Sequence, residues 1–206
     1  MALLFVPLCP DVMLGQTPEK LFQTEEVNLE KALLYPEKII RLDLGNQNIK
    51  LDNVDFSKFV NLEYLSLAND RLKELPLGLS SLKKLKILDL SGNDFENLPE
   101  DFGNLTSLEE LYLNRERKFK LENNVTILSR LASLRSLHLE NDKLKKLPAE
   151  IMLLQNLRYL YLNNNQFKEF PIEVQGLQQL QYLDLKDNYL DSKDILHLNF
   201  GFQINL

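Results

Sequence analysis

The chain has 206 residues, of which 44% are hydrophobic and 26% charged, and its net charge at pH 7 is −6. This length suits one sizeable domain, and seven Gly and eight Pro are too few for a long flexible linker or a low-complexity tract. The acidic balance argues against a nucleic-acid partner, because phosphate binding depends on a basic surface. A single cysteine, Cys9, excludes an internal disulfide and leaves a Cys/His catalytic pair without support.

The first segment, residues 1–15, contains the apolar run Ala2–Leu8 without a positively charged stretch before it. Two interpretations stay open: the remnant of a signal segment, or a plain N-terminal tail. No apolar run in the chain reaches the roughly 18 residues that a membrane span needs. Residues 16–38 predict an N-terminal helical cap that ends at Pro36. Its apolar side chains are expected to cover the first repeat: Val27, Leu29, Ala32, Leu33 and Leu34.

Residues 39–190 repeat the pattern L-x-x-L-x-L-x-x-N-x-L seven times. The repeats start at residues 39, 62, 85, 108, 134, 157 and 180, so every spacing is 23 residues except that of the fourth repeat, which is 26 (134 − 108). Positions four and six are leucine in all seven copies, for example Leu88 and Leu90. Fourteen leucines at a fixed phase indicate one structural unit used seven times.

Each repeat predicts a short strand followed by a short helical segment. The two leucines of the L-x-L step point to one side of a strand, and the residue between them points to the other. The second half of a repeat supplies apolar residues three or four apart after a Leu-Pro step, as in Leu98-Pro99, Phe102 and Leu105, which suits a short helix or 3₁₀ turn. No repeat can bury its apolar side alone. We therefore expect an α/β solenoid, an arc with a parallel concave sheet and short helical or 3₁₀ convex segments, capped at both ends.

The ninth position of the pattern favours asparagine, whose side chain bonds neighbouring backbones. Here that position holds Gln47, Asp70, Asn93, Glu116, Asp142, Asn165 and Asn188. Aspartate can still accept hydrogen bonds but lacks the amide donors. Glu116 fits the pattern least well and lies in the long fourth repeat, so we expect local distortion there. Residues 191–206 alternate apolar and other residues, which predicts an extended closing cap, with a hairpin turn near Gly201.

The repeats resemble the leucine-rich-repeat superfamily, specifically the bacterial 23-residue subclass with a Leu-Pro step, and residues 88–99 have that signature. Residues 28–44 are also similar to the first segment of spirochaete-type secreted repeat proteins. The resemblance implies an arc-shaped scaffold that recognises proteins on its concave side, and secretion or cell-surface display, with a cytoplasmic location as the alternative. It supplies no catalytic residue and no cofactor, and a host surface protein is one candidate partner.

The outward positions three, five and seven of the repeats hold five of the seven tyrosines and none of the eleven phenylalanines. Tyrosine is favoured at binding surfaces, because it offers a large, stiff contact area with a polar end. The alternative explanation is that tyrosine simply favours strands. The candidate partner-binding residues are Tyr64, Ile87, Asp89, Glu110, Tyr112, His138, Glu140, Tyr159, Tyr161, Tyr182 and Asp184. The carboxylates among them predict a basic or polar-aromatic partner surface.

Two further features are His138 and the basic segment of the fourth repeat. His138, between Tyr112 and Tyr161 in adjacent repeats, is expected to be a solvent-exposed contact residue rather than a metal ligand, because no second histidine or cysteine lies near it. The fourth repeat contains Arg115, Arg117, Lys118 and Lys120 around Phe119, which we interpret as a solvated loop, with a docking feature for an acidic partner or a lipid head group as the alternative.

No catalytic constellation, phosphate loop or metal-ligand cluster is visible in the sequence, so we expect a non-catalytic binding protein. Two alternatives stay open: a structural, self-associating repeat protein, and the non-catalytic part of an enzyme or effector assembly.

Overall fold

The computed structural model describes residues 28–116, 118–191 and 201–206. The first segment 1–15, the part of the expected cap before Asn28, and residues 192–200 of the expected C-terminal cap lie outside these ranges. None of the helices in the described ranges combines the length and the apolar character that a membrane span requires.

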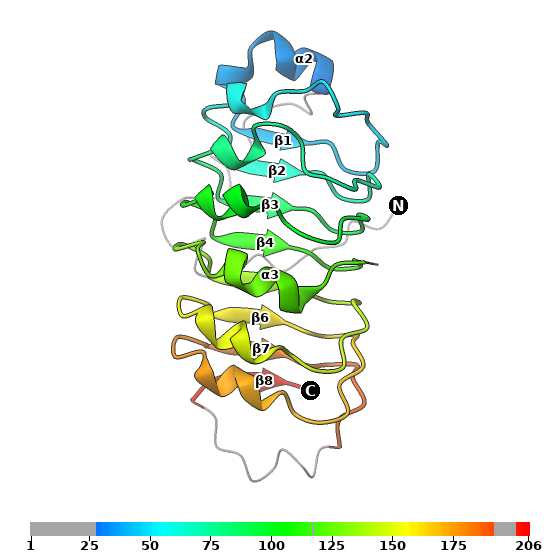
Figure 1. Ribbon diagram of the computed structural model, residues 1–206, viewed down its shortest axis with the longest axis vertical. Coiled ribbons are helices and arrows are strands. Elements are labelled where there is room, and N and C mark those ends of the chain that lie inside the picture. Colours follow the sequence, from blue (N-terminus) through cyan, green and yellow to red (C-terminus); the bar gives the residue numbers. More distant parts are fainter. Residues whose placement is uncertain (1–27, 117, 192–200) are drawn as a thin grey trace.

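Eight short strands form one parallel sheet in chain order, stacked along the long axis of the molecule (Figure 1). Neighbouring strands pair position by position, so that Leu65 lies beside Leu88 and Leu88 beside Leu111. The strands are β1 (Arg41–Asp43), β2 (Tyr64–Ser66), β3 (Ile87–Asp89), β4 (Glu110–Tyr112), β5 (Ser136–His138), β6 (Tyr159–Tyr161), β7 (Tyr182–Asp184) and β8 (Gln203–Asn205). The seven predicted repeat strands are confirmed, and the chain adds an eighth.

The second layer consists of short helical segments, one for most turns of the solenoid. Five of them are 3₁₀ helices: η3 (Phe56–Lys58), η4 (Leu79–Ser81), η5 (Glu100–Asn104), η6 (Ala149–Leu153) and η7 (Ile172–Gly176). In the long fourth repeat the corresponding segment is the α-helix α3 (Leu121–Leu128). The distortion expected in that repeat is therefore an extra helical turn, and the strands on either side of it keep their register.

The core lies between the two layers and contains the leucines that define the repeat. All fourteen leucines at positions four and six are no more than 1% exposed. Five phenylalanines fill the helical side of the same core: Phe56, Phe59, Phe95, Phe102 and Phe167. The absence of phenylalanine from the outward strand positions thus reflects in part its use in the buried core.

The two ends of the solenoid differ from the expectations in detail. The N-terminal cap contains α2 (Leu29–Leu34) and η2 (Pro36–Lys38), and Ala32 is buried as predicted. The prediction that Leu33 and Leu34 cover the first repeat is wrong, because both are exposed. At the other end, β8 pairs in parallel with β7 and continues the solenoid. The first arm of the expected hairpin would lie within 192–200, outside the described residues.

A ladder of ninth-position side chains holds the turns that follow the strands. Asn93 donates to the carbonyls of Leu67 and Leu90 and accepts from the backbone of the preceding repeat. At the fourth and fifth repeats the ladder holds Glu116 and Asp142, whose side chains accept from Asn93 N and Glu116 N. Neither ionised carboxylate has the proton that an amide would donate to a carbonyl.

Burial, with a smaller contribution from the neighbouring Asp142 carboxylate, raises the pKa of Glu116 to about 8 against the hydrogen bond from Asn93 N. Burial likewise raises the pKa of Asp142 to about 8. Glu116 is only 7% exposed, and its Oε2 has no hydrogen-bond partner among the described residues. At neutral pH the folded protein therefore favours the protonated form of both the Glu116 and the Asp142 carboxyl groups.

We expect the free energy of unfolding to fall as the pH rises from about 5 to 8, because folding takes up protons over this interval. Replacing Glu116 with glutamine removes one titrating group and supplies amide donors. At pH 8 the variant should be more stable than the parent by on the order of 2 kcal/mol, and the two should converge near pH 5. Urea unfolding at pH 5, 6.5 and 8 measures this difference. The exposed Glu150→Gln is the control, and a Glu116→Gln profile parallel to the parent profile would show that Glu116 is ionised throughout.

Candidate functional site

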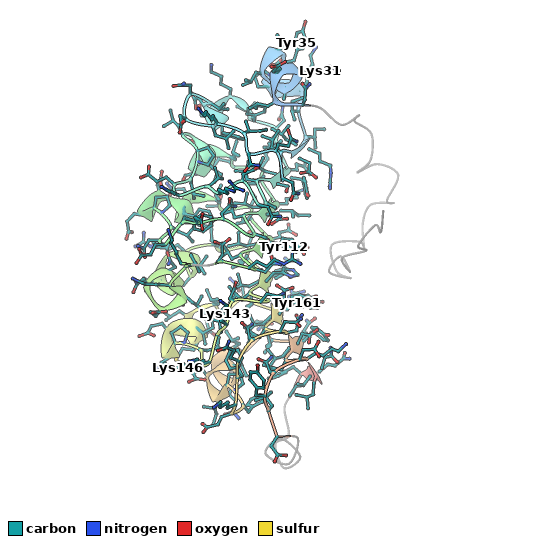
Figure 2. The ribbon with its side chains drawn as sticks, turned by 90° about the vertical axis from the view of Figure 1, so that its right-hand side faces the viewer. Lys31, Tyr35, Tyr112, Lys143, Lys146 and Tyr161 are labelled. Atoms are coloured by element: carbon teal, nitrogen blue, oxygen red, sulfur yellow. The ribbon has the colours of Figure 1, made fainter. Side chains whose placement is uncertain are left out.

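The side chains at positions three, five and seven of the repeats lie on the face of the sheet away from the helical layer, which we call the open face. Figure 2 shows Tyr112 and Tyr161 on this side, opposite the helical segments. The site on the open face begins with three planar rings at position five of adjacent strands. His138 stacks on Tyr112, with ring centroids 3.9 Å apart and an interplanar angle of 15°. On its other side His138 stacks on Tyr161 at 4.2 Å and 7°.

This stack follows from the parallel register of the sheet. Tyr112, His138 and Tyr161 are direct partners across β4, β5 and β6. Parallel strands lie about 4.8 Å apart, so planar side chains at one position of consecutive strands meet face to face. Tyr182 on β7 extends the row, with its ring 5.7 Å from that of Tyr161 at an angle of 52°. We call Tyr112, His138, Tyr161 and Tyr182 the aromatic row.

Two carboxylates hold the edge of the His138 ring, one at each ring nitrogen. Its Nε2 lies 3.1 Å from Glu110 Oε1, and its Nδ1 lies 3.1 Å from Glu140 Oε1. The Ser136 hydroxyl also lies 3.2 Å from Nε2. A carboxylate acceptor at each nitrogen favours the doubly protonated, positively charged imidazole. Burial alone would lower the pKa of His138, but the hydrogen bonds to Glu110 and Glu140 outweigh it, and the pKa is raised.

The expectation that His138 is solvent-exposed is wrong, because the side chain is only 2% exposed. The tyrosine rings on either side cover it. Glu110 and Tyr159 are also buried, at 1% and 7% exposed. Glu110 Oε1 accepts from the Tyr112 hydroxyl at 2.5 Å, and the Tyr159 hydroxyl donates to Gln181 at 3.2 Å. These three side chains lie on the open face but are enclosed by their neighbours.

The other eight candidate residues are at least partly exposed: Tyr64, Ile87, Asp89, Tyr112, Glu140, Tyr161, Tyr182 and Asp184. The structure brings Glu140, Tyr161 and Tyr182 together with Tyr112 in the aromatic row or beside it. Tyr64, on β2, lies outside this group. Burial raises the pKa of Tyr64 to about 12, so its hydroxyl keeps its proton at neutral pH.

The sequence analysis missed the role of Arg41. Its guanidinium carbon lies 3.5 Å from the centre of the Tyr64 ring, a cation–π contact within the open face. Arg41 and Tyr64 occupy position three of neighbouring repeats and are paired across β1 and β2. Aligning the repeats by position would have indicated this contact, because it puts an arginine and a tyrosine at the same position of adjacent strands.

The open face is acidic around the aromatic row. Carboxylates at its outward positions are Asp43, Asp89, Glu110, Glu140 and Asp184, and the positive side chains there, apart from His138, are Arg41 and Lys186. Burial raises the pKa of Asp89, against hydrogen bonds from Ser91. Burial and the Glu110 carboxylate raise the pKa of Tyr112. A partner would thus meet tyrosines among partly dehydrated carboxylates.

The described residues contain no group of three or more His, Cys, Asp or Glu side chains placed to hold a metal ion. In the basic segment of the fourth repeat, Lys120 is paired with Glu96, and the ring of Phe119 packs edge-on against Phe95 at 6.0 Å. Arg115 and Lys118 are exposed, and Arg117 lies outside the described residues. These contacts favour a solvated loop over a docking feature.

Comparison with known proteins gives matches over most of the chain. A leucine-rich repeat region model matches residues 38–126, and a leucine rich repeat model matches residues 132–190. The chain is 30% identical to a leucine-rich-repeat protein of Leptospira interrogans, with a TM-score of 0.60; the match covers 80% of this chain and 47% of that one. No curated protein matches the chain.

Two further solved structures share the fold. A chain in the TLR13–ssRNA13 complex is 31% identical with a TM-score of 0.64, over 80% of this chain and 25% of that one. An internalin of Listeria monocytogenes is 21% identical with a TM-score of 0.52, over 82% of this chain and 53% of that one. This chain therefore spans between a quarter and about half of the length of these neighbours.

Proposed function

Because the chain belongs to the leucine-rich-repeat proteins, whose fold commonly serves protein–protein interaction, we propose that it is a non-catalytic scaffold that binds a protein partner on its open face. The proposal includes membership of the bacterial 23-residue subclass, supported by the 23-residue spacing, the Leu-Pro steps and the similarity to the Leptospira protein. It also includes secretion or surface display, supported by the resemblance of residues 28–44 to secreted repeat proteins.

The aromatic row is the observation that supports this proposal most strongly. Tyr112, Tyr161 and Tyr182 are partly exposed, and each is held by ring contacts with its neighbours. Tyrosines fixed in this way lose little conformational entropy on binding, which is why they dominate the energetics of many interfaces. Strand preference alone explains tyrosine on the sheet, but it does not explain a clustered row bonded to the buried carboxylate of Glu110.

A protein is a better partner than a nucleic acid for this face. The TLR13 neighbour was solved with RNA, so the fold itself is compatible with such a ligand. In this chain, however, five carboxylates lie at the outward positions and the net charge is −6. A phosphate backbone binds where cations neutralise its charge, and carboxylates repel phosphate groups.

The test is a triple substitution, Tyr112→Ala, Tyr161→Ala and Tyr182→Ala. A partner is first captured with the parent protein from native or host extracts, and its affinity for parent and variant is then measured by calorimetry. We expect the variant to bind at least about 100-fold more weakly, since a central interface tyrosine often contributes 2 kcal/mol or more. Tyr189→Ala, exposed and away from the aromatic row, is the matched control. Equal affinities of parent and triple variant would refute the proposal, provided that circular dichroism shows both folded.

A further inference from the structure

We propose that the β3–β4 end of the aromatic row is a binding site for an arginine side chain, presented by a basic segment of the protein partner. This inference rests on the proposed function and names the chemistry of the partner. The site consists of the outer face of the Tyr112 ring, the carboxylate of Asp89 on β3, and the carboxylates of Asp43 and Glu110 near them. We call it the guanidinium site.

The ring of Tyr112 has a ring partner on one face. One ring face stacks on His138, toward β5. The other therefore points toward β3, where Asp89 is the paired residue. In the part of the chain that the structure describes, no aromatic ring or cation covers this second face. The opposite end of the row differs, because the ring of Tyr182 packs against Tyr161.

Beyond Tyr112 the side chains at position five become short. β3, β2 and β1 carry Asp89, Ser66 and Asp43 at this position, whereas β4, β5 and β6 carry two tyrosines and a histidine. The open face therefore steps down at the outer face of Tyr112, and two carboxylates line the lower level. A flat cation fits against a ring on one side and carboxylates on the other.

One carboxylate oxygen at this step, on Glu110, has no hydrogen-bond donor among the described residues. Glu110 is 1% exposed, and its Oε2 has no hydrogen-bond partner among the described residues, although its Oε1 accepts from Tyr112 and His138. Glu110 therefore adds negative charge beside the step, which favours a cation bound there. Asp89 accepts from the Ser91 hydroxyl at 2.5 Å and from Ser91 N at 2.9 Å, which fixes its orientation.

The same face already holds one guanidinium by the same chemistry. Arg41 on β1 lies over the Tyr64 ring of β2 at 3.5 Å, and Asp43 is two residues along β1. The guanidinium site repeats this combination of tyrosine and aspartate without a cation of its own. An arginine fits better than a lysine, because its planar group can stack on the ring and bond a carboxylate at the same time.

The experiment uses defined probes and the full-length protein. The affinities of hexa-arginine, hexalysine and hexaglutamate peptides are measured by calorimetry at low salt. We expect hexa-arginine to bind most tightly, hexalysine several-fold more weakly, and hexaglutamate not at all. Asp89→Asn and Tyr112→Leu should each weaken hexa-arginine binding by about five- to tenfold. Tyr112→Phe keeps the ring and should retain most of the binding.

The matched control is Asp101→Asn, which removes one exposed carboxylate from η5 in the helical layer. We expect it to change hexa-arginine binding by less than about twofold, as a distant surface charge should. An equal loss in Asp101→Asn and Asp89→Asn, equal binding of hexa-arginine and hexalysine, or tighter binding of a single-stranded oligonucleotide would each overturn the guanidinium site.

The two proposals fail in distinguishable ways. If the triple tyrosine variant loses the captured partner while Asp89→Asn leaves hexa-arginine binding unchanged, the scaffold function stands and the guanidinium site is wrong. If Asp89→Asn weakens hexa-arginine binding while the triple variant keeps the partner, the site binds a guanidinium but the partner binds elsewhere, and the assignment of this site to an arginine of the partner is wrong.

Discussion

Replacing His138 with alanine should lower the free energy of unfolding by about 3–5 kcal/mol near pH 6, because it removes the cation from a buried cluster of charges. Glu110 and Glu140 each bond one nitrogen of the imidazolium at 3.1 Å. Without it, a 1% exposed carboxylate would keep only the Tyr112 hydroxyl as a donor. The cavity between two tyrosine rings adds to the loss. Urea unfolding followed by far-ultraviolet circular dichroism measures the difference.

The pH dependence of this loss has a defined sign. The pKa of His138 is raised in the folded protein above its ordinary value. The stability that the imidazolium contributes is therefore fully present below about pH 6.5 and is lost as the pH rises through the raised pKa. The gap between parent and His138→Ala should be largest at pH 6 and should narrow toward pH 9.

Two variants separate the charge of His138 from its volume. His138→Gln keeps a donor and most of the volume, so it should be less destabilising than His138→Ala at pH 6. Adding Glu110→Gln to His138→Ala should restore part of the lost stability, because it removes the uncompensated carboxylate. A loss below 1 kcal/mol in His138→Ala at pH 6 would mean that the carboxyl groups take up protons in place of the imidazole.

The strands and the core could be predicted from the sequence because both follow from local spacing. Leu88 and Leu90 are buried for the same reason as the other leucines of the pattern: a period of two within each strand and of about 23 between strands. Strand register follows as well, since Leu88 and Leu111 hold the same position in adjacent repeats. Because each repeat contacts only the adjacent repeats, the pairing of strands follows from the order of the repeats in the chain.

The burial of the candidate site could not be predicted in the same way. The pattern places Glu110 and His138 on the outward side, and their side chains do lie on the open face. It does not show that Tyr112 and Tyr161 enclose the His138 ring, because that depends on side-chain conformations across three repeats. The sequence therefore predicted where the aromatic row lies but not that a buried ion pair supports it. The alternation in residues 191–206 predicted an extended segment, but not that β8 pairs in parallel with β7, because Ile204 follows its partner Leu183 by 21 residues (204 − 183) rather than 23.

A second large loss of stability is expected when an asparagine of the ninth-position ladder is replaced. Asn165 is 4% exposed and donates to the carbonyls of Leu139 at 2.8 Å and Leu162 at 3.0 Å. Its side-chain oxygen accepts from the backbone N–H groups of Asp142 and Leu144, both at 3.0 Å. Asn165→Ala removes these four hydrogen bonds and leaves three backbone groups without a side-chain partner, since the Leu162 carbonyl also accepts from Asn188 at 2.9 Å, so it should lower the free energy of unfolding by about 4 kcal/mol.

A graded series tests whether these four bonds are responsible. Asn165→Asp keeps the acceptor and loses both donors, so it should cost about half as much as Asn165→Ala. The chain itself supports this expectation: Asp70 accepts from Gln47 N and Asn48 N at 2.9 and 2.8 Å without any amide to donate. Asn156 is exposed and makes one such bond, to the Ala132 carbonyl at 2.9 Å, so Asn156→Ala should cost less than about 1 kcal/mol. If Asn165→Ala were no more destabilising than Asn156→Ala in urea unfolding, packing of the leucines rather than the ladder would hold the turns of the solenoid together.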